Sequence, residues 1–209
     1  MKNVNIINHP VIQHKLTVLR DRTTTPLSFR LICDEISQLL AFEVSRELKT
    51  KKLPIQTPLE STEGVEIAEN VAIVAIMRAG NGMLQGMLRT LPFATVGHIG
   101  IYRDRFIQST VEYYLRLPKN IKGAHVFLLD PLLASGDTAV AAIDRLKENE
   151  VGAIHFISFL AAPEGLEKIA AIHPEVKVTT LSIERELNSS GFILPGIGDA
   201  GERLYDHMI

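Results

Sequence analysis

Cysteine is almost absent from this 209-residue sequence, which contains only Cys33. A single cysteine cannot form an internal disulfide, and this favours a reducing, cytoplasmic environment. Cys33 lies within a helical pattern, where a small buried core residue is a better interpretation than a catalytic thiol. Long apolar runs are also missing: none approaches the ~20 residues that span a bilayer, and the N-terminus shows no apolar signal core. We therefore expect a cytoplasmic protein with no membrane partner.

Excess charge and metal-ligand patterns are missing as well. The formal net charge is −2, so we expect no basic surface and no nucleic-acid partner. The seven histidines are scattered without the spacing of metal ligands, and a structural zinc site finds no support. The sequence has neither a Walker lysine loop nor a GxGxxG motif, which disfavours nucleoside-triphosphatases and dinucleotide-dependent oxidoreductases.

The apolar residues that are present, 46% of the chain, form short runs that alternate with helical patterns. Such alternation indicates an α/β fold with a central, mostly parallel sheet flanked by helices, and with ligands at the carboxyl ends of the strands. The length suits a single domain, 1–209, with a helical region over 1–50. Predicted strands cover 71–77, 94–101, 124–129, 153–161 and 176–183, and predicted helices cover 26–48, 82–90, 138–149 and 164–172.

Three segments interrupt this alternation. Residues 54–68 contain two prolines and a glycine, and we interpret them as a loop or a short edge strand. Residues 102–118 are polar and aromatic and too long for an ordinary connection. We expect a hairpin arm or flap there, which is also a candidate for an arm exchanged between subunits. The glycine-rich segment 191–203 is irregular but contains Ile193 and Asp199, which argues against a disordered end.

The most informative stretch is 124–142. Its apolar run, 126–129, predicts a buried strand that ends on the carboxylate of Asp130. A turn of small and hydroxyl residues, 134–138, follows, and then a helix begins. Unpaired amides and the positive end of a helix dipole favour an anion such as phosphate at this point. Since Asp130 is placed to accept hydrogen bonds from sugar hydroxyls, the stretch predicts a site for a ribose 5-phosphate group.

Together with several other motifs, this stretch resembles the uracil phosphoribosyltransferases, a family with the type I phosphoribosyltransferase fold. LDPLLASGDTA (129–139) resembles the family's motif for phosphoribosyl pyrophosphate (PRPP), and GFILPGIGDAGER (191–203) resembles its base-binding segment, which spans about 184–203. The resemblance implies a pyrimidine-salvage enzyme that converts uracil and PRPP to UMP and diphosphate. Further motifs match in order and spacing: His9-Pro10 with QHKLTVLRD (13–21), RAGNGM (78–83), GHIGIYRD (97–104) and EYYLRLP (112–118).

The resemblance also implies roles for individual residues. Asp130, Arg103 and Asp199 form the catalytic set. Asp130 orients the ribose hydroxyls, Arg103 arrives with the flap, and Asp199 either helps to hold PRPP or its magnesium, which we favour, or takes the N1 proton of uracil. Magnesium is the expected cofactor, carried by the diphosphate rather than by direct protein ligands. The uracil-binding residues are Ile193, Gly198, Asp199 and Ala200, and the PRPP-binding residues are Arg78, Arg103, Asp130, Pro131, Leu132, Leu133, Ala134, Ser135, Gly136, Asp137, Thr138 and Asp199.

Five residues depart from the pattern that the resemblance leads us to expect. Asp137 stands where a small residue such as glycine is expected, and a carboxylate ~4 Å from the phosphate would cost on the order of 4 kcal/mol at an effective dielectric constant of about 20. We therefore expect this carboxylate to point away, into solvent or toward the first helical turn. Glu184 replaces a shorter aspartate and Glu186 a glycine, which alters the expected floor of the base pocket. Asn81 replaces an apolar residue and Arg105 an acid, changes that bear on fine tuning more than on activity.

Two other functions remain open from the sequence. A regulator that senses a sugar phosphate without turnover would keep the phosphate turn, but an RNA-binding regulator should also carry a basic surface. A phosphoribosyltransferase for another base would differ mainly in the base segment, where IGDAG (197–201) favours uracil. The resemblance further implies a homodimer or an assembly of dimers. It also makes GTP, which regulates parts of the family, a candidate effector.

Overall fold

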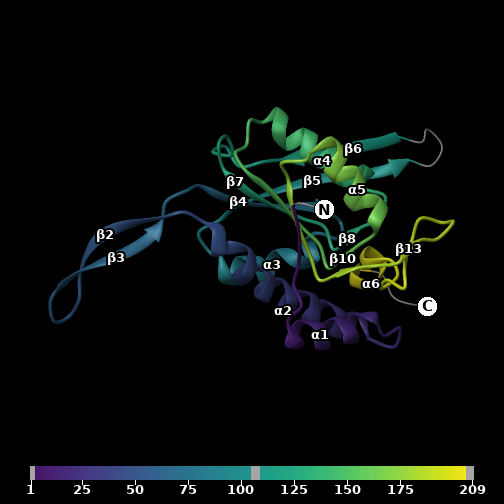
Figure 1. Ribbon diagram of the computed structural model, residues 1–209, viewed down its shortest axis with the longest axis horizontal. Coiled ribbons are helices and arrows are strands. Elements are labelled where there is room, and N and C mark those ends of the chain that lie inside the picture. The colour runs from purple at the N-terminus through teal and green to yellow at the C-terminus, as the bar shows by residue number, and fades with distance from the viewer. Residues whose placement is uncertain (1–2, 105–108, 206–209) are drawn as a thin grey trace.

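A seven-stranded sheet forms the centre of the computed structural model (Figure 1). The structure describes residues 3–104 and 109–205, without the side chains of residues 103, 104 and 109. The strands are β1 (Val4–Ile6), β4 (Val71–Met77), β5 (Thr95–Asp104), β6 (Ser109–Arg116), β7 (His125–Leu129), β9 (Ile154–Ile157) and β11 (Lys177–Thr180). Their order is β1-β11-β9-β7-β4-β5-β6, and all neighbours are parallel except β5 and β6. The predicted α/β class with a mostly parallel sheet is therefore confirmed.

Helices cover both faces of this sheet (Figure 1). They are α1 (Pro10–Arg20), α2 (Pro26–Val44), α3 (Asn81–Thr90), α4 (Asp137–Glu148), α5 (Pro163–Ile172) and α6 (Ala200–Tyr205), with a single 3-10 turn after α2, η1 (Ser45–Glu47), in the part of the chain that the structure describes. One core cluster joins α1, α2, α3 and α6 to Ile73 and Phe127, and the other joins α4 and α5 to Val74 and Val126. Alternate side chains of β4 and β7 thus enter different apolar layers, which is why both strands are continuous apolar runs.

The four predicted helices are present with ends shifted by a few residues. Thr25 caps α2 and Pro26 occupies its first turn. α1 lies within the region 1–50 that was predicted to be helical, although its own bounds were not predicted, and it packs Ile12, Leu16 and Leu19 against the core. α6 was not predicted, because six residues are too few for a periodic signal. Within the described residues, no helix combines the length and the apolar character that crossing a membrane requires.

A second, smaller sheet continues beyond the carboxyl end of the main sheet. After short breaks, β7, β9 and β11 are followed by β8 (Leu132–Leu133), β10 (Leu160–Ala161) and β12 (Ser182–Ile183), which pair in the parallel order β12-β10-β8. A final antiparallel pair consists of β13 (Glu186–Leu187) and β14 (Ile193–Leu194). These strands lie after the carboxyl ends of the main strands, where open α/β sheets bind their ligands.

Residues 54–68 form most of a long hairpin, so the prediction of a loop or short edge strand is wrong. β2 (Thr50–Gln56) and β3 (Ser61–Ile67) pair along their full length and extend away from the body of the molecule (Figure 1). Most of their side chains are exposed, including the apolar Ile55 and Val65. Because neither face of this hairpin is buried, the sequence lacks the apolar–polar alternation that marks a half-buried strand.

The segment 102–118 contributes to a hairpin, as predicted. β5 and β6 pair in an antiparallel arrangement at the edge of the main sheet, with a register shift between Gly100 and Ile101. Arg105 lies outside the described residues, so the structure gives no account of its departure from the expected acid. Whether the hairpin closes over a ligand as a flap stays a prediction.

Candidate active site

Asp130 follows the end of β7 at the carboxyl edge of the sheet. Its side chain is half-buried, and Oδ1 accepts a hydrogen bond from the Leu132 amide at 3.4 Å. Burial raises the pKa of Asp130 to about 7, the nearby carboxylate of Asp199 adds to the rise, and the Leu132 amide opposes it. A carboxyl group with a pKa near neutrality beside a pocket is a candidate functional group.

The loop that follows β7 is held by its carbonyl groups. The Pro131 carbonyl accepts a hydrogen bond from the Phe159 amide at 2.9 Å, and the Leu133 carbonyl accepts one from the Ala162 amide at 2.8 Å. The amides of residues 134–136 donate to no backbone carbonyl in the part of the chain that the structure describes. The loop is therefore anchored on one side and keeps its donors available for an anion.

Gly136 turns this loop into α4. Its φ is +83°, and its carbonyl accepts a helical hydrogen bond from the Val140 amide at 2.9 Å. Glycine adopts this backbone conformation without steric strain. The first amides of α4, including that of Thr138, have no intrahelical partner and lie directly after the loop amides. We call residues 130–138 the phosphate loop.

Sequence alone predicted solvent or the first helical turn as the surroundings of the Asp137 carboxylate, but it faces a neighbouring helix. Oδ1 accepts a hydrogen bond from the Lys168 ammonium of α5 at 2.5 Å. Oδ2 accepts one from the Ser135 hydroxyl at 2.8 Å. The Ser135 hydroxyl, which the sequence suggested as a phosphate donor, therefore donates its hydrogen bond to Asp137 in this structure.

Arg78 follows β4 at the same edge of the sheet, and the peptide bond between Met77 and Arg78 is cis. Its guanidinium lies 5.9 Å from the centre of the Tyr205 ring, and its carbonyl accepts a hydrogen bond from the Tyr205 hydroxyl at 3.2 Å. A Cβ at Gly80 would lie 2.4 Å from the Leu129 carbonyl oxygen. The segment after β4 is thus packed directly against the end of β7.

The predicted base-binding residues surround the start of α6. Ile193 and Ala200 are buried, whereas Gly198 and Asp199 are exposed. Asp199 also has a structural task, because its Oδ1 accepts a hydrogen bond at 3.0 Å from the Glu202 amide in the first turn of α6. This bond caps the helix and fixes the direction of the Asp199 carboxylate.

A pocket of about 200 Å³ joins the end of β7 to the base segment. Ala79, from the segment after β4, lines it as well. Of the predicted residues, the lining contains Asp130, Leu132 and Ala134 from the phosphate loop, and Ile193, Gly198, Asp199 and Ala200 from the base segment. The remaining predicted residues with described side chains, Arg78, Pro131, Leu133, Ser135, Gly136, Asp137 and Thr138, lie outside this lining. The side chain of Arg103 is not among those described.

Glu184, expected to alter the pocket floor, is part of a buried ion pair that sequence reasoning missed. Arg20 donates hydrogen bonds to both carboxylate oxygens, at 2.8 and 2.7 Å, and a third to the Gly196 carbonyl at 3.1 Å. The Gly196 amide donates back to Glu184 at 3.0 Å. Burial acts to raise the pKa of Glu184, but the hydrogen bonds from Arg20, Ser182 and Gly196 outweigh it and lower the pKa to about 2.

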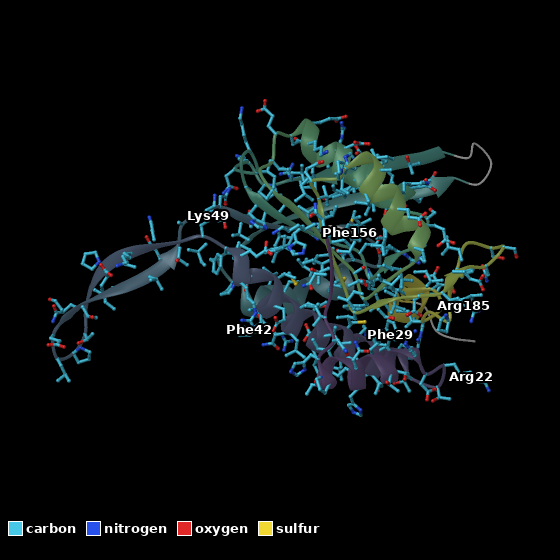
Figure 2. The ribbon with its side chains drawn as sticks, viewed as in Figure 1. Arg22, Phe29, Phe42, Lys49, Phe156 and Arg185 are labelled. Carbon is cyan, nitrogen blue, oxygen red and sulfur yellow. The ribbon has the colours of Figure 1, made fainter. Side chains whose placement is uncertain are left out.

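Arg203 is a second anchor that sequence reasoning missed. It is 7% exposed and stacks on Phe29, with its guanidinium carbon 4.3 Å from the ring centre. It donates hydrogen bonds to the carbonyls of Leu19, Asp21 (2.7 Å) and Ile197 (3.0 Å). Arg203, from the base segment, therefore binds the end of α1, just as Arg20, from the end of α1, binds Gly196 in the base segment. Figure 2 shows Phe29 on α2, in the helical layer beneath the base segment.

Comparison with known proteins identifies the family to which this chain belongs. A family model described as uracil phosphoribosyltransferase matches residues 6–206. The chain belongs to the uracil phosphoribosyltransferase family. The uracil phosphoribosyltransferase of Variovorax paradoxus (strain S110) is 46% identical over 206 residues, which cover 98% of this chain and 99% of that protein. That of Rhizobium leguminosarum bv. trifolii (strain WSM2304) is 45% identical over the same length.

Two solved structures share the fold of this chain. The AQ2163 protein from Aquifex aeolicus superposes with a TM-score of 0.92 at 32% identity, covering 97% of this chain and 98% of that one. Adenine phosphoribosyltransferase from Leishmania donovani shares the fold alone, with a TM-score of 0.60 at 14% identity over 91% of this chain and 88% of that one. The resemblance inferred from the motifs is therefore confirmed, as is the class of enzyme, a phosphoribosyltransferase.

Proposed function

We propose that this member of the uracil phosphoribosyltransferase family transfers the phosphoribosyl group of PRPP to uracil and releases UMP and diphosphate, in pyrimidine salvage. The observation that carries this proposal is the pocket of about 200 Å³ that Asp130 shares with Ile193 and Asp199. It puts the carboxylate suited to a ribose beside the backbone suited to a pyrimidine. Family membership over nearly the whole chain supports the same activity.

The phosphate loop binds the ribose 5-phosphate. A phosphate monoester carries a charge of about −1.5 to −2 near neutral pH. The amides of residues 134–136 and of Thr138 can each contribute a charge-assisted hydrogen bond, worth roughly 1.5–3 kcal/mol. Asp130, at the start of the loop, accepts hydrogen bonds from the ribose hydroxyls. Ionised Asp130 also offsets the positive charge that develops on the ribose ring as the glycosidic bond to diphosphate breaks.

Arg78, Arg103 and Asp199 hold the diphosphate end of PRPP. The carboxylate of Asp199 lies close enough to Asp130 to help raise the pKa of Asp130. In the described chain no cluster of three or more His, Cys, Asp or Glu side chains could hold a metal by itself. The carboxylates of Asp130 and Asp199 line the same pocket and would suit a magnesium ion carried by the diphosphate. When bound, magnesium would neutralise part of the negative charge on the leaving diphosphate.

The base segment reads the edge of uracil. Uracil presents two carbonyl acceptors with an N3–H donor between them, which calls for a donor–acceptor–donor array. The backbone of Ile193 and of residues 198–200 supplies this array. Cytosine would place an amino donor opposite a backbone N–H donor. The two donors cannot pair, and the unpaired buried group would weaken cytosine binding by about 1–3 kcal/mol.

Catalysis in this proposal needs no nucleophilic side chain. The pocket holds uracil N1 and the ribose carbon in line, and the arginines stabilise the charge that grows on the diphosphate. The β5–β6 hairpin closes over the site as a flap, brings Arg103 to the diphosphate, and keeps water from intercepting the ribosyl cation.

A substrate panel tests the proposal directly. Purified protein is incubated with PRPP, magnesium and, in turn, uracil, cytosine, hypoxanthine or orotate, and product formation is followed by chromatography. UMP formation from uracil alone is the expected result. Turnover of a different base would show another specificity, and binding of UMP without turnover would identify a sugar-phosphate sensor. A crystal soaked with UMP that left the phosphate loop empty would contradict the site assignment.

The protein acts as a homodimer or an assembly of dimers in the cytoplasm. The β2–β3 hairpin extends from the body and exposes Ile55, Leu59 and Val65, so it is a better candidate for an intersubunit arm than segment 102–118. Light scattering of the wild type and of Val65→Glu tests this assignment, and a smaller assembly is expected for the variant. GTP is the candidate effector, and adding it to the uracil assay measures any activation.

A further inference from the structure

We propose that Lys168 is a positioning residue for PRPP: it neutralises Asp137, so that the phosphate loop can accept a dianionic phosphate although it carries a carboxylate. This inference rests on the proposed function, which places the 5-phosphate at the phosphate loop. It assigns a role in substrate binding to a residue of α5, a helix that supplies no lining residue to the pocket.

Asp137 is held by two hydrogen bonds that orient its carboxylate. Asp137 is the first residue of α4, directly after Gly136 and within the phosphate loop. Its two carboxylate oxygens are bonded to different partners, Oδ1 to the Lys168 ammonium at 2.5 Å and Oδ2 to the Ser135 hydroxyl at 2.8 Å. Both bonds draw the carboxylate toward α5 and Ser135, and the ammonium provides a positive charge at the same position.

α5 packs closely against the phosphate loop. A Cβ at Gly165 would lie 2.4 Å from the Ala134 carbonyl oxygen, and a Cβ at Gly136 would lie 3.1 Å from the Gly165 carbonyl oxygen. The two backbones therefore touch, which only small residues allow. Because Lys168 lies three residues after Gly165, on the same side of α5, this close contact brings its ammonium to Asp137.

The Lys168–Asp137 ion pair affects PRPP binding through electrostatic repulsion between the carboxylate and the phosphate. At ~4 Å and an effective dielectric constant of about 20, two like unit charges repel strongly enough to weaken binding several hundredfold. The side chains of Lys168 and Asp137 are 37% and 26% exposed, so solvent and salt reduce the effect, and we expect about a tenfold weakening of PRPP binding without Lys168. A partly exposed ion pair adds little to stability, so the effect should appear in substrate binding.

Three variants separate this role from direct phosphate binding: Lys168→Met, Asp137→Asn and the double variant. Lys168→Met should raise the KM for PRPP about tenfold, while kcat and the KM for uracil change less than about twofold. Asp137→Asn removes the carboxylate and leaves the Lys168 ammonium unopposed, so its KM for PRPP should fall below that of the wild type. In the double variant the KM for PRPP should return to within about threefold of the wild type.

Lys147→Met is the matched control. Lys147 also links α4 to the α5 region by an ion pair, with Glu175, and its side chain is 40% exposed. It lies in the last turn of α4, whereas the phosphate loop includes the first residues of that helix, so its loss should leave both KM values unchanged.

Each outcome bears on the proposal. An unchanged KM for PRPP in Lys168→Met, in protein whose melting temperature matches the wild type, would overturn it. A KM that stays high in the double variant would show that Lys168 contacts the phosphate itself, which also overturns it. Should Lys168→Met fold poorly, Lys168→Gln gives the same comparison. If the wild type makes no UMP, the proposed function fails as well, whereas normal UMP formation with an insensitive Lys168 rejects this inference alone.

Discussion

The phosphate loop and the base segment line one pocket, but different interactions hold them in place. The carbonyls of the loop accept hydrogen bonds from the chain around β10, fewer than thirty residues further on, as in the 2.9 Å bond from Phe159 to Pro131. The base segment is held by Arg20 and Arg203, whose guanidinium groups join chain segments more than 170 residues apart. Backbone bonds between adjacent strands do not depend on side-chain identity, whereas each arginine is one side chain that carries several bonds.

This difference shows which half of the pocket is vulnerable to single substitutions. Replacing a side chain in the phosphate loop leaves its backbone anchors in place, so the loop should fold and lose only substrate contacts. Removing a guanidinium or its carboxylate partner leaves buried backbone groups unpaired, which costs stability before it affects chemistry. Four substitutions test this difference.

Arg203→Met should have the largest effect, a loss of about 3–5 kcal/mol in the free energy of unfolding. The substitution leaves the buried carbonyls of Leu19 and Ile197 without their donor, and each bond from a charged group is worth about 1.5–3 kcal/mol. Urea denaturation measures the change. Arg185→Met is the control, since the Arg185 side chain is 67% exposed and pairs with its neighbour Glu186. Equal losses in both variants would contradict the anchoring role of Arg203.

Asp130→Asn should lower kcat/KM for PRPP about a hundredfold at pH 8, because the ionised carboxylate no longer offsets charge on the ribose. The pKa of Asp130 is about 7 in the free protein, and kcat/KM reports groups of the free enzyme. Wild-type kcat/KM should therefore fall as the pH drops below about 7, and the variant should lack this fall. A variant with the wild-type pH profile would assign the titration to another group.

The same variant should be more stable than the wild type at alkaline pH. Folding raises the pKa of Asp130 from 3.8 to about 7, so the wild type loses stability as the pH rises through this range and the carboxyl group ionises. Because the side chain is half-buried, we expect a gain of ~1 kcal/mol for Asp130→Asn at pH 8, or about 2–4 °C in Tm. At pH 4 the gain should vanish, and calorimetry at the two pH values makes the comparison.

Glu184→Gln should lower the free energy of unfolding by about 2 kcal/mol at pH 7 and raise the KM for uracil more than that for PRPP. Folding lowers the pKa of Glu184 from 4.5 to about 2. Its stabilisation is therefore complete above pH 4.5 and is lost as the pH falls toward 2. The difference in urea midpoint between variant and wild type should therefore be smaller at pH 3 than at pH 7. Glu186→Gln, at an exposed position in the same segment, should leave the midpoints unchanged.

Gly165→Ala should have the smallest effect, ~1 kcal/mol of stability and a few-fold rise in the KM for PRPP. The new Cβ would lie 2.4 Å from the Ala134 carbonyl oxygen, so the phosphate loop must shift. The KM for uracil should not change. Gly64→Ala is the control, because its Cβ would meet only the flexible Ile55 side chain, at 3.3 Å. A selective change in the KM for uracil would contradict separate anchoring of the two halves.

The predictability of the molecule follows the same division. The strands β4 and β7 are continuous apolar runs, and the turn into α4 has small and hydroxyl residues at the positions that need them, so local sequence sufficed for both. The β2–β3 hairpin escaped prediction because its side chains face solvent on both sides. α6 escaped because it has only six residues.

Side-chain partners were much harder to predict than elements. Nothing near Arg20 in the sequence indicates Glu184, and nothing near Asp137 indicates Lys168, because each partner comes from a different element of the fold. Glu184 was noticed as a departure from the expected aspartate, but its ion pair needed coordinates. The base segment itself was found through its resemblance to a family motif, not through any local physical signal.

The bonds from Arg20 to Gly196 and from Arg203 to Leu19 also bear on how the protein is made. During translation, the phosphate loop and its partner strand leave the ribosome well before the base segment. The uracil side of the pocket cannot form until the segments around Arg20 and Arg203 meet. A ribosome-bound intermediate that ends before residue 190 should already contain most of the sheet, yet it should be unable to bind the base.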